Sequence, residues 1–223
     1  MNGPEPDQVF LHRAALSRDA RAASGLVLVL FLVLHLAAVA LAPLAPARFE
    51  ALATWLHGLV WFSVLEVALA LLLLLHPALA LAKTLALRGV RGPVAAPLRS
   101  RRGGGVEALA AAAGRGLPWS GAVLLLFLPV HLAQLRWSRP AAGAELLALR
   151  QALASPWSLL LYAAAGVALA LHLLHGTESA HRSLGLLEPG HAGPIRRAGR
   201  ALALLLGGGF VLVPLALRLG SGG

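Results

Sequence analysis

Five long apolar runs limit what this chain can fold into. A helix that crosses a lipid bilayer needs about 20 mostly apolar residues. Runs of this kind lie at residues 22–41, 57–81, 117–135, 157–184 and 201–217. They are continuous and do not alternate with polar residues, so they predict helices and not the strands of a barrel. We therefore expect one all-α membrane domain over residues 1–223, with five transmembrane helices.

The composition agrees with a membrane protein. Hydrophobic residues make up 58% of the chain and charged residues 13%, which leaves too little polar surface for a soluble domain of this size. The first apolar run begins after Arg21 without a small-residue cleavage pattern, so it predicts a span and not a cleaved signal. The absence of cysteine excludes disulfides, thiolate metal sites and iron–sulfur clusters held by this chain.

The basic residues predict the orientation of the chain. Lysine and arginine are concentrated in segments 1–21, 82–116 and 176–200, which lie on the same side of the predicted bundle. Cytoplasmic connections are usually the basic ones, so we expect the N-terminus inside and the C-terminus outside. The net charge of +10 then indicates topology and anionic lipid, and no nucleic-acid partner. Residues 88–105 predict a loop followed by a short helix at 106–113, and residues 187–197 predict another loop.

Four histidines lie inside the apolar runs, one in each of the first four predicted helices. A strongly polar side chain within the bilayer is costly and suggests function. At 1.5 Å per residue, His35 and His131 lie about 21 and 24 Å from the inner face, and His76 and His172 about 10 and 15 Å. The depths predict an outer pair, His35 with His131, and an inner pair, His76 with His172.

Paired imidazoles at one depth are suited to haem. A low-spin haem b takes two axial histidines, and two stacked haems would relay electrons across the membrane. The alternative is that each histidine only hydrogen-bonds a neighbouring helix. Four histidines, one per helix and paired by depth, favour haem. From the residues alone, His175 competes with His172 because it lies one turn away.

An internal repeat supports the outer pair. Residues 24–37 read SGLVLVLFLVLHLA and residues 120–133 read SGAVLLLFLPVHLA, with the serine, glycine, phenylalanine and histidine in common. Gly25 and Gly121 each precede the histidine of their segment by nearly three turns, so we expect glycine and histidine to share a face. A glycine there predicts close approach of a porphyrin or of another helix.

Three residues are candidates for quinone chemistry. Glu66 lies within the second apolar run and is interpreted either as a protonated, packed carboxyl or as a group that takes up protons at a quinol site. Glu50 has a similar position just outside that run. His57 lies at the outer start of the predicted second helix.

The repeat segments and the stretch ALHLLHGTESAHRSLGLLEP at residues 170–189 carry a resemblance. Over nearly its whole length the chain resembles the di-haem cytochrome b membrane-anchor subunit of succinate dehydrogenases and fumarate reductases. The resemblance implies five helices and two haems b, with His35 and His131 on the outer haem and His76 and His172 on the inner one. In that family a ligand histidine precedes a glycine by four residues; Gly176 therefore favours His172 over His175.

Further expectations depend on the resemblance. It implies Lys83 near a haem propionate and Arg182 in the surroundings of the inner haem, although Glu178 could simply pair with Arg182 one turn away. It implies flavoprotein and iron–sulfur subunits on the cytoplasmic side, a quinone, most simply menaquinone, and the cytoplasmic membrane of a bacterium. A higher oligomer of the complex is compatible with it. Thr177 and Glu178 depart from the family's pattern.

Two other functions remain open at this point. One is the cytochrome b anchor of a different quinone-linked dehydrogenase or hydrogenase, which the partner subunits would distinguish. The other is a haem-free transporter or scaffold, in which the histidines pack or carry protons. Transporters more often show interrupted helices or charges at the midplane, whereas Glu66 is the one acidic residue deep in an apolar run.

Overall fold

The computed structural model describes residues 6–90, 116–186, 190 and 192–220. Within these ranges the chain forms helices and turns and no strand, which confirms the all-α class. Among the described residues, five helices are long and apolar enough to cross a membrane. The predicted short helix at 106–113 lies outside the described residues.

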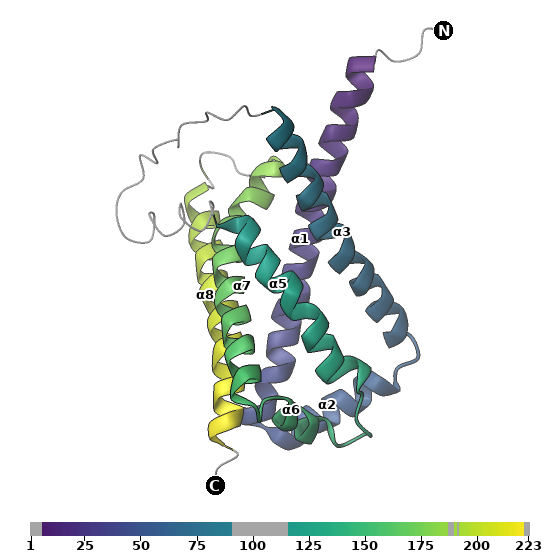
Figure 1. Cartoon of the computed structure of the whole chain (residues 1–223), viewed down its shortest axis with the longest axis vertical. Helices are drawn as coiled ribbons and strands as arrows, with labels where there is room; N and C mark the ends of the chain where they lie inside the picture. Colours follow the sequence, from purple (N-terminus) through teal and green to yellow (C-terminus); the bar gives the residue numbers. More distant parts are fainter. Residues whose placement is uncertain (1–5, 91–115, 187–189, 191, 221–223) are drawn as a thin grey trace.

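In the part of the chain that the structure describes, five long helices make up the body of the bundle (Figure 1). They are α1 (Pro6–Leu44), α3 (Phe62–Val90), α5 (Leu117–Leu132), α7 (Pro156–Ser183) and α8 (Ala192–Leu219). A π-helical turn, η1 (Ala133–Trp137), continues α5. Two shorter helices, α2 (Pro46–Gly58) and α6 (Glu145–Ala152), lie side by side at the end of the bundle opposite the start of α1.

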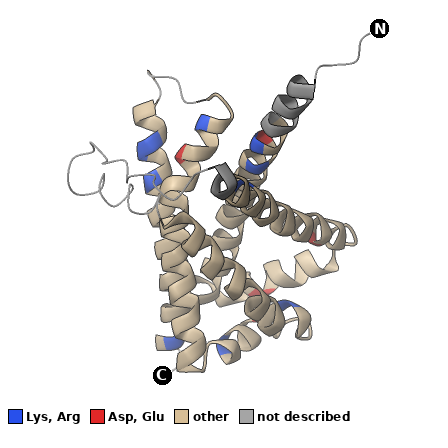
Figure 2. Ribbon diagram, turned by 45° about the horizontal axis from the view of Figure 1, so that its top comes forward, with Lys and Arg blue, Asp and Glu red and all other residues tan. Residues whose placement is uncertain are grey.

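Successive long helices run in opposite directions. The start of α1 and the end of α8 therefore lie at opposite ends of the molecule (Figure 1). Lysine and arginine gather toward the helix ends, and the middle lengths of the bundle are almost free of charge (Figure 2). This is the distribution that a hydrocarbon layer around the middle of the helices requires.

The second predicted span is wrong at its start. Residues 57–81 were expected to form one helix, but α2 ends at Gly58 and α3 begins at Phe62. Pro46 lies in the first turn of α2, and Leu59 is extended, with φ −81° and ψ 118°, which separates the two helices. The break was concealed because apolar residues continue across it. His57 consequently lies on α2 and not on a membrane-spanning helix.

Two other boundaries differ because helices continue beyond the apolar residues. The loop predicted at 187–197 is wrong from Ala192, where α8 begins, and residues 88–90 belong to α3 and not to a loop. An apolar window detects the length inside the membrane, whereas backbone hydrogen bonding continues into polar residues. Pro194 is tolerated because it lies in the first turn of α8, where an N–H has no helical partner.

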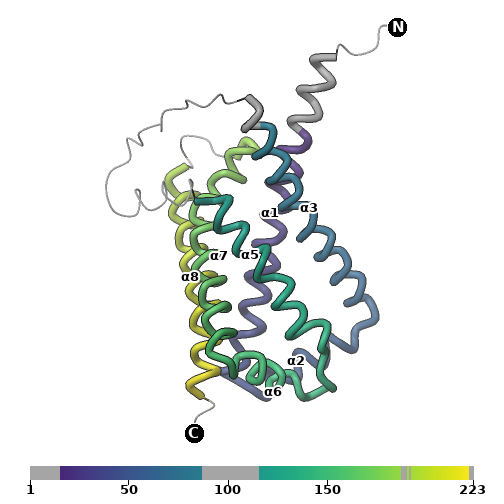
Figure 3. Tube along the Cα trace, viewed as in Figure 1, coloured from purple at the N-terminus to yellow at the C-terminus, as the bar shows by residue number. Residues whose placement is uncertain are grey.

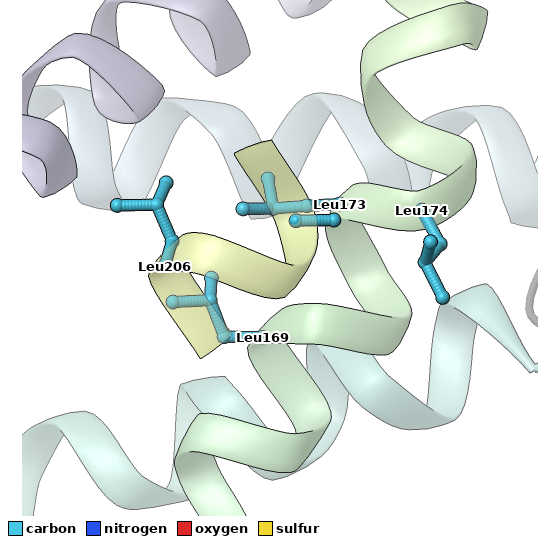
Figure 4. Packing of buried hydrophobic residues seen from close by; sticks show 5 residues of the cluster. Leu169, Leu173, Leu174 and Leu206 are labelled. Carbon is cyan, nitrogen blue, oxygen red and sulfur yellow. The ribbon is translucent and has the colours of Figure 1, made fainter. Parts of the chain in front are cut away.

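Helices α7 and α8 form the tightest part of the bundle. A Cβ added at Gly207 would overlap Ala170 Cβ and would lie 2.8 Å from the carbonyl oxygen of Gly166, so only a small residue permits this approach. Around the crossing the two helices bury a cluster of apolar side chains (Figure 4). Its members are Leu169, Leu173, Leu174, Ala203 and Leu206.

Helix α3 is the least covered of the long helices. It lies near α1 at the end where α3 finishes and diverges from α1 toward its own start (Figure 3). None of its most apolar stretch is buried, against 33% of the corresponding stretch of α7. Helix α7 contacts α8, α5 and α1, and is thus the central element that the other helices pack against.

Candidate functional site

The structure brings His35 of α1 beside His131 of α5. Their ring centroids lie 6.0 Å apart, and the ring planes are at 81°. Aromatic rings enclose the pair: Phe31 stacks on His35 at 5.3 Å and Phe127 stacks on His131 at 5.4 Å, each from one turn earlier on the same helix. Phe210 of α8 lies 5.8 Å from His35. This outer pair is therefore enclosed by apolar rings contributed by three helices.

Tyr162 of α7 fixes one ring of the outer pair. Its hydroxyl lies 3.3 Å from His131 Nδ1 and donates its hydrogen to Gln134 Oε1 at 3.1 Å. The amide of Gln134 in turn donates to Ser158 Oγ at 3.1 Å. Because the tyrosine hydrogen is already used, the phenol oxygen accepts a hydrogen bond from His131 Nδ1–H, and Nε2 keeps its lone pair.

The structure also brings His76 of α3 beside His172 of α7. Their ring centroids lie 6.4 Å apart, with the planes at 74°. The imidazole beside His76 is that of His172, the residue that competed with His175 on sequence grounds. Ser24 Oγ lies 3.2 Å from His76 Nδ1, and Ser120 Oγ lies 3.4 Å from His172 Nδ1. Each inner ring is thus held by a serine of the neighbouring helix.

The serines define the tautomer of the inner rings. Each hydroxyl donates its single hydrogen to the backbone oxygen three residues earlier, at 3.0 Å for Ser24 and 3.1 Å for Ser120. The oxygen can then only accept, so Nδ1 carries the hydrogen on both imidazoles. In both rings Nε2 remains a free lone pair, which is the form of histidine that binds a metal.

The two pairs fit bis-histidine haem. Two imidazoles bonded to one iron at about 2 Å place their ring centroids about 6 Å apart. The observed separations of 6.0 and 6.4 Å match that value. No group of three or more metal-binding side chains gathers in the described ranges, but a haem needs only two axial ligands from the protein because the porphyrin supplies the others.

The glycines of the repeat lie at the inner pair and not at the outer one. A Cβ at Gly25 would lie 3.0 Å from His76 Cε1, and a Cβ at Gly121 would lie 3.4 Å from His172 Cε1. We expected each glycine to share a face with the histidine of its own segment and to permit close approach of a porphyrin or of another helix. The structure shows such an approach, and the group that approaches each glycine is a histidine ring of the neighbouring helix.

Glu66 is engaged by two arginines. Arg136 Nε donates to Glu66 Oε1 at 2.7 Å, and the Arg136 Nη2 atom pairs with Oε2, so the contact is bidentate. Arg139 Nη2 lies 3.2 Å from Oε1. A carboxylate in this setting is an ion-pair partner, which argues against the protonated and packed interpretation.

Glu50 and His57 belong to the junction of α2 and α6. Glu50 accepts hydrogen bonds from the backbone N–H groups of Leu146 at 2.7 Å and Glu145 at 3.3 Å, and so caps the start of α6. His57 Nδ1 lies 3.4 Å from Glu145 Oε1. Burial raises the pKa of the Glu145 carboxyl, but its hydrogen bonds to Glu50, the backbone and His57 outweigh burial and hold that pKa below its ordinary value.

The two basic candidates lie toward the other end of the bundle. Lys83 is exposed on α3, two turns beyond His76. Arg182 Nη2 pairs with Glu178 Oε1 at 2.7 Å, as the one-turn spacing predicts, and Arg196 lies 3.8 Å from the same oxygen. Arg182 therefore forms an ion pair with the buried carboxylate of Glu178 in this structure.

Sequence reasoning did not assign the residues that hold the histidine rings. Ser24, Ser120 and Tyr162 were absent from the predicted sites, as were the stacking rings of Phe31 and Phe127. The repeat contained most of this signal, because serine and phenylalanine are among its shared residues. The neighbouring-helix contacts of the serines became visible only in three dimensions.

Comparisons with known proteins found no match among family models, curated proteins or solved structures. The functional argument therefore depends on the chain's own residues and their geometry.

Proposed function

We propose that the chain is a membrane cytochrome b that holds two haems b, one between each pair of histidines. The observation that carries the proposal is the paired geometry: two sets of facing imidazoles, 6.0 and 6.4 Å apart, within one apolar bundle. In three of the four rings Nδ1 faces a hydroxyl oxygen, which leaves Nε2 to bind iron.

The separation of the pairs suits electron transfer across the bilayer. Ser24, at the level of the inner pair, precedes His35 by eleven residues on α1, a rise of about 16 Å. Ser120 and His131 repeat this spacing on α5. A bound haem would supply one-electron redox chemistry. The protein would hold each iron by two imidazoles, and Phe31, Phe127 and Phe210 would keep water from the outer site.

We further propose the particular role that the resemblance implies: the membrane anchor of a succinate dehydrogenase or fumarate reductase. The basic segments at the N-terminal end of α1 and between the later helices support a cytoplasmic N-terminus, where flavoprotein and iron–sulfur subunits would dock. The chain would pass electrons between those subunits and a membrane quinone, and the dicarboxylate chemistry would belong to the partners. The proposal assigns no quinol base to Glu50 or Glu66, because both carboxylates have structural partners.

The first test is a reduced-minus-oxidised spectrum of the purified full chain, with haem quantified against protein. We expect b-type bands and two haems per chain. His35→Ala and His76→Ala should each remove one haem, and the remaining haem should differ between the two variants. A chain without b-type bands, a ratio near one, or loss of the same haem in both variants would overturn the two-haem proposal.

A second test addresses the partners. The chain is purified with its associated subunits from native membranes, and these are identified. A flavoprotein and an iron–sulfur protein with succinate-dependent haem reduction would support the anchor proposal. Partners of a hydrogenase or formate dehydrogenase would replace it, while leaving the two-haem proposal intact.

A further inference from the structure

The same contact is built twice at the inner histidine pair. In each half of the chain a serine lies 52 residues before the histidine that it faces: Ser24 before His76 and Ser120 before His172. Both serines are buried, with exposed fractions of 4% and 7%. In each case the hydroxyl oxygen approaches Nδ1 of an imidazole on the neighbouring helix.

A serine inside a helix ordinarily needs no partner beyond its own helix. Its hydroxyl bonds a backbone oxygen of the preceding turn, as both of these serines do. That bond satisfies the hydrogen but leaves the oxygen lone pairs free in an apolar region. In both serines the hydroxyl oxygen faces the Nδ1 atom of an imidazole. The residue after each serine is a glycine, Gly25 or Gly121, that lies against the same ring. Each half of the chain therefore places a serine oxygen and a glycine against one imidazole. Packing of the helices alone would not require a hydroxyl oxygen at Nδ1 in both halves.

We propose that Ser24 and Ser120 are positioning residues that set the tautomer, orientation and basicity of the two inner imidazoles. This inference rests on the proposed function, because it concerns the inner pair as ligands of a haem. Each serine oxygen accepts the Nδ1–H hydrogen bond, so the ring is fixed at Nδ1 and Nε2 keeps its lone pair. The adjacent glycine provides room for the ring, since a Cβ would lie within 3.4 Å of it or closer.

The hydrogen bond has a predictable effect on redox behaviour. An acceptor at Nδ1–H increases the electron density that the imidazole donates to the metal. This favours the ferric state, so the serines should lower the midpoint potential of the inner haem. Removing their hydroxyls should shift that potential to a more positive value and leave the outer haem unchanged, because the outer rings have other partners such as Tyr162.

The test compares the full-length wild type with Ser24→Ala/Ser120→Ala and with Ser24→Thr/Ser120→Thr. Haem content, a spectroscopic redox titration and the low-spin electron paramagnetic resonance signals are measured for each. We expect the alanine variant to show a positive shift at the inner haem and an altered inner signal. The threonine variant keeps the hydroxyl and should return both to near wild-type values. Ser63→Ala is the matched control, since Ser63 is exposed on α3.

The outcomes separate this inference from the proposed function. A wild type without two haems overturns the proposed function before any serine variant is considered. If the wild type holds two haems and the alanine variant leaves the inner potential and signal unchanged, the positioning role is overturned. If the alanine variant loses the inner haem, recovery in the threonine variant supports the role. Equal loss in the threonine variant overturns it.

Discussion

The two halves of the chain, α1 to α3 and α5 to α7, place the same residue types at the same spacings and surround them differently. In each half a serine and a glycine on the first long helix face a histidine on the second. In each half the first helix also carries the histidine of the outer pair. Helix α7 is then covered by α8, whereas α3 stands apart along much of its length (Figure 3).

One position shows what this difference does to chemistry. Glu66 lies ten residues before His76, and Tyr162 lies ten residues before His172. On the well-packed α7, Tyr162 reaches His131 of the adjacent helix. On the divergent α3, the equivalent residue instead reaches Arg136 of η1 and forms an ion pair. The residue at this position therefore contacts a histidine ring in the second half and forms ion pairs with arginine in the first half.

The largest effect is expected at the helix crossing that covers the second half. Gly207→Val would force a side chain against Ala170 and separate α7 from α8, at a cost of about 1–3 kcal/mol for overpacking. Gly208→Val is the matched control, because nothing lies within 4 Å of a Cβ added there. Thermal unfolding in detergent should show a lower Tm for the first variant alone. Equal Tm values would mean that α8 does not stabilise the second half.

The next effect separates the two glycines at the inner pair. Gly25→Ala should disturb His76 more than Gly121→Ala disturbs His172, because the added Cβ would lie 3.0 Å from one ring and 3.4 Å from the other. Retention of haem during dilution or mild heating would measure this order. Gly58→Ala, in open space on α2, should behave as the wild type. The reverse order would show that α3 adjusts more easily than α7.

A smaller effect concerns the ion pair of the first half. A double-mutant cycle of Glu66→Gln and Arg136→Gln should give a coupling of about 1 kcal/mol, because the contact is bidentate but partly exposed. The coupling should fall as salt is added. Tyr162→Phe should change stability without salt dependence, since its partners are uncharged. A coupling of zero would mean that α3 is not held to η1 by this contact.

The smallest effect is expected where α2 meets α6. Glu50→Ala removes the cap of α6 and should cost about 0.5 kcal/mol, the low end of the range for a helix cap, with faster amide exchange at Leu146. Arg48→Ala, exposed on the same helix, is the control. The lowered pKa of Glu145 adds a pH signature: its stabilisation is present above its ordinary pKa of 4.5 and is lost as the pH falls through the folded value. Unchanged exchange in the Glu50 variant would contradict the capping role.

The sequence by itself determined the class of the fold and the membership of the histidine pairs. Apolar length is a one-dimensional property, so five spans could be counted without a structure. Depth along a helix is also one-dimensional, so the rise per residue sufficed to group His35 with His131 and His76 with His172. The ring separations in the structure follow this grouping.

Only the tertiary structure decided which side chains contact each histidine. The sequence predicted a close approach at Gly25 without naming the group that approaches, and the crossing of α1 and α3 shows that this group is His76. Glu66 and Tyr162 occupy equivalent positions yet meet different partners. Such contacts depend on how neighbouring helices are rotated and inclined relative to each other. The spacing of residues along one helix does not say which side chains of the next helix they will contact. The break at Leu59 was hidden for a related reason, since apolar residues on both sides satisfied the same hydropathy pattern.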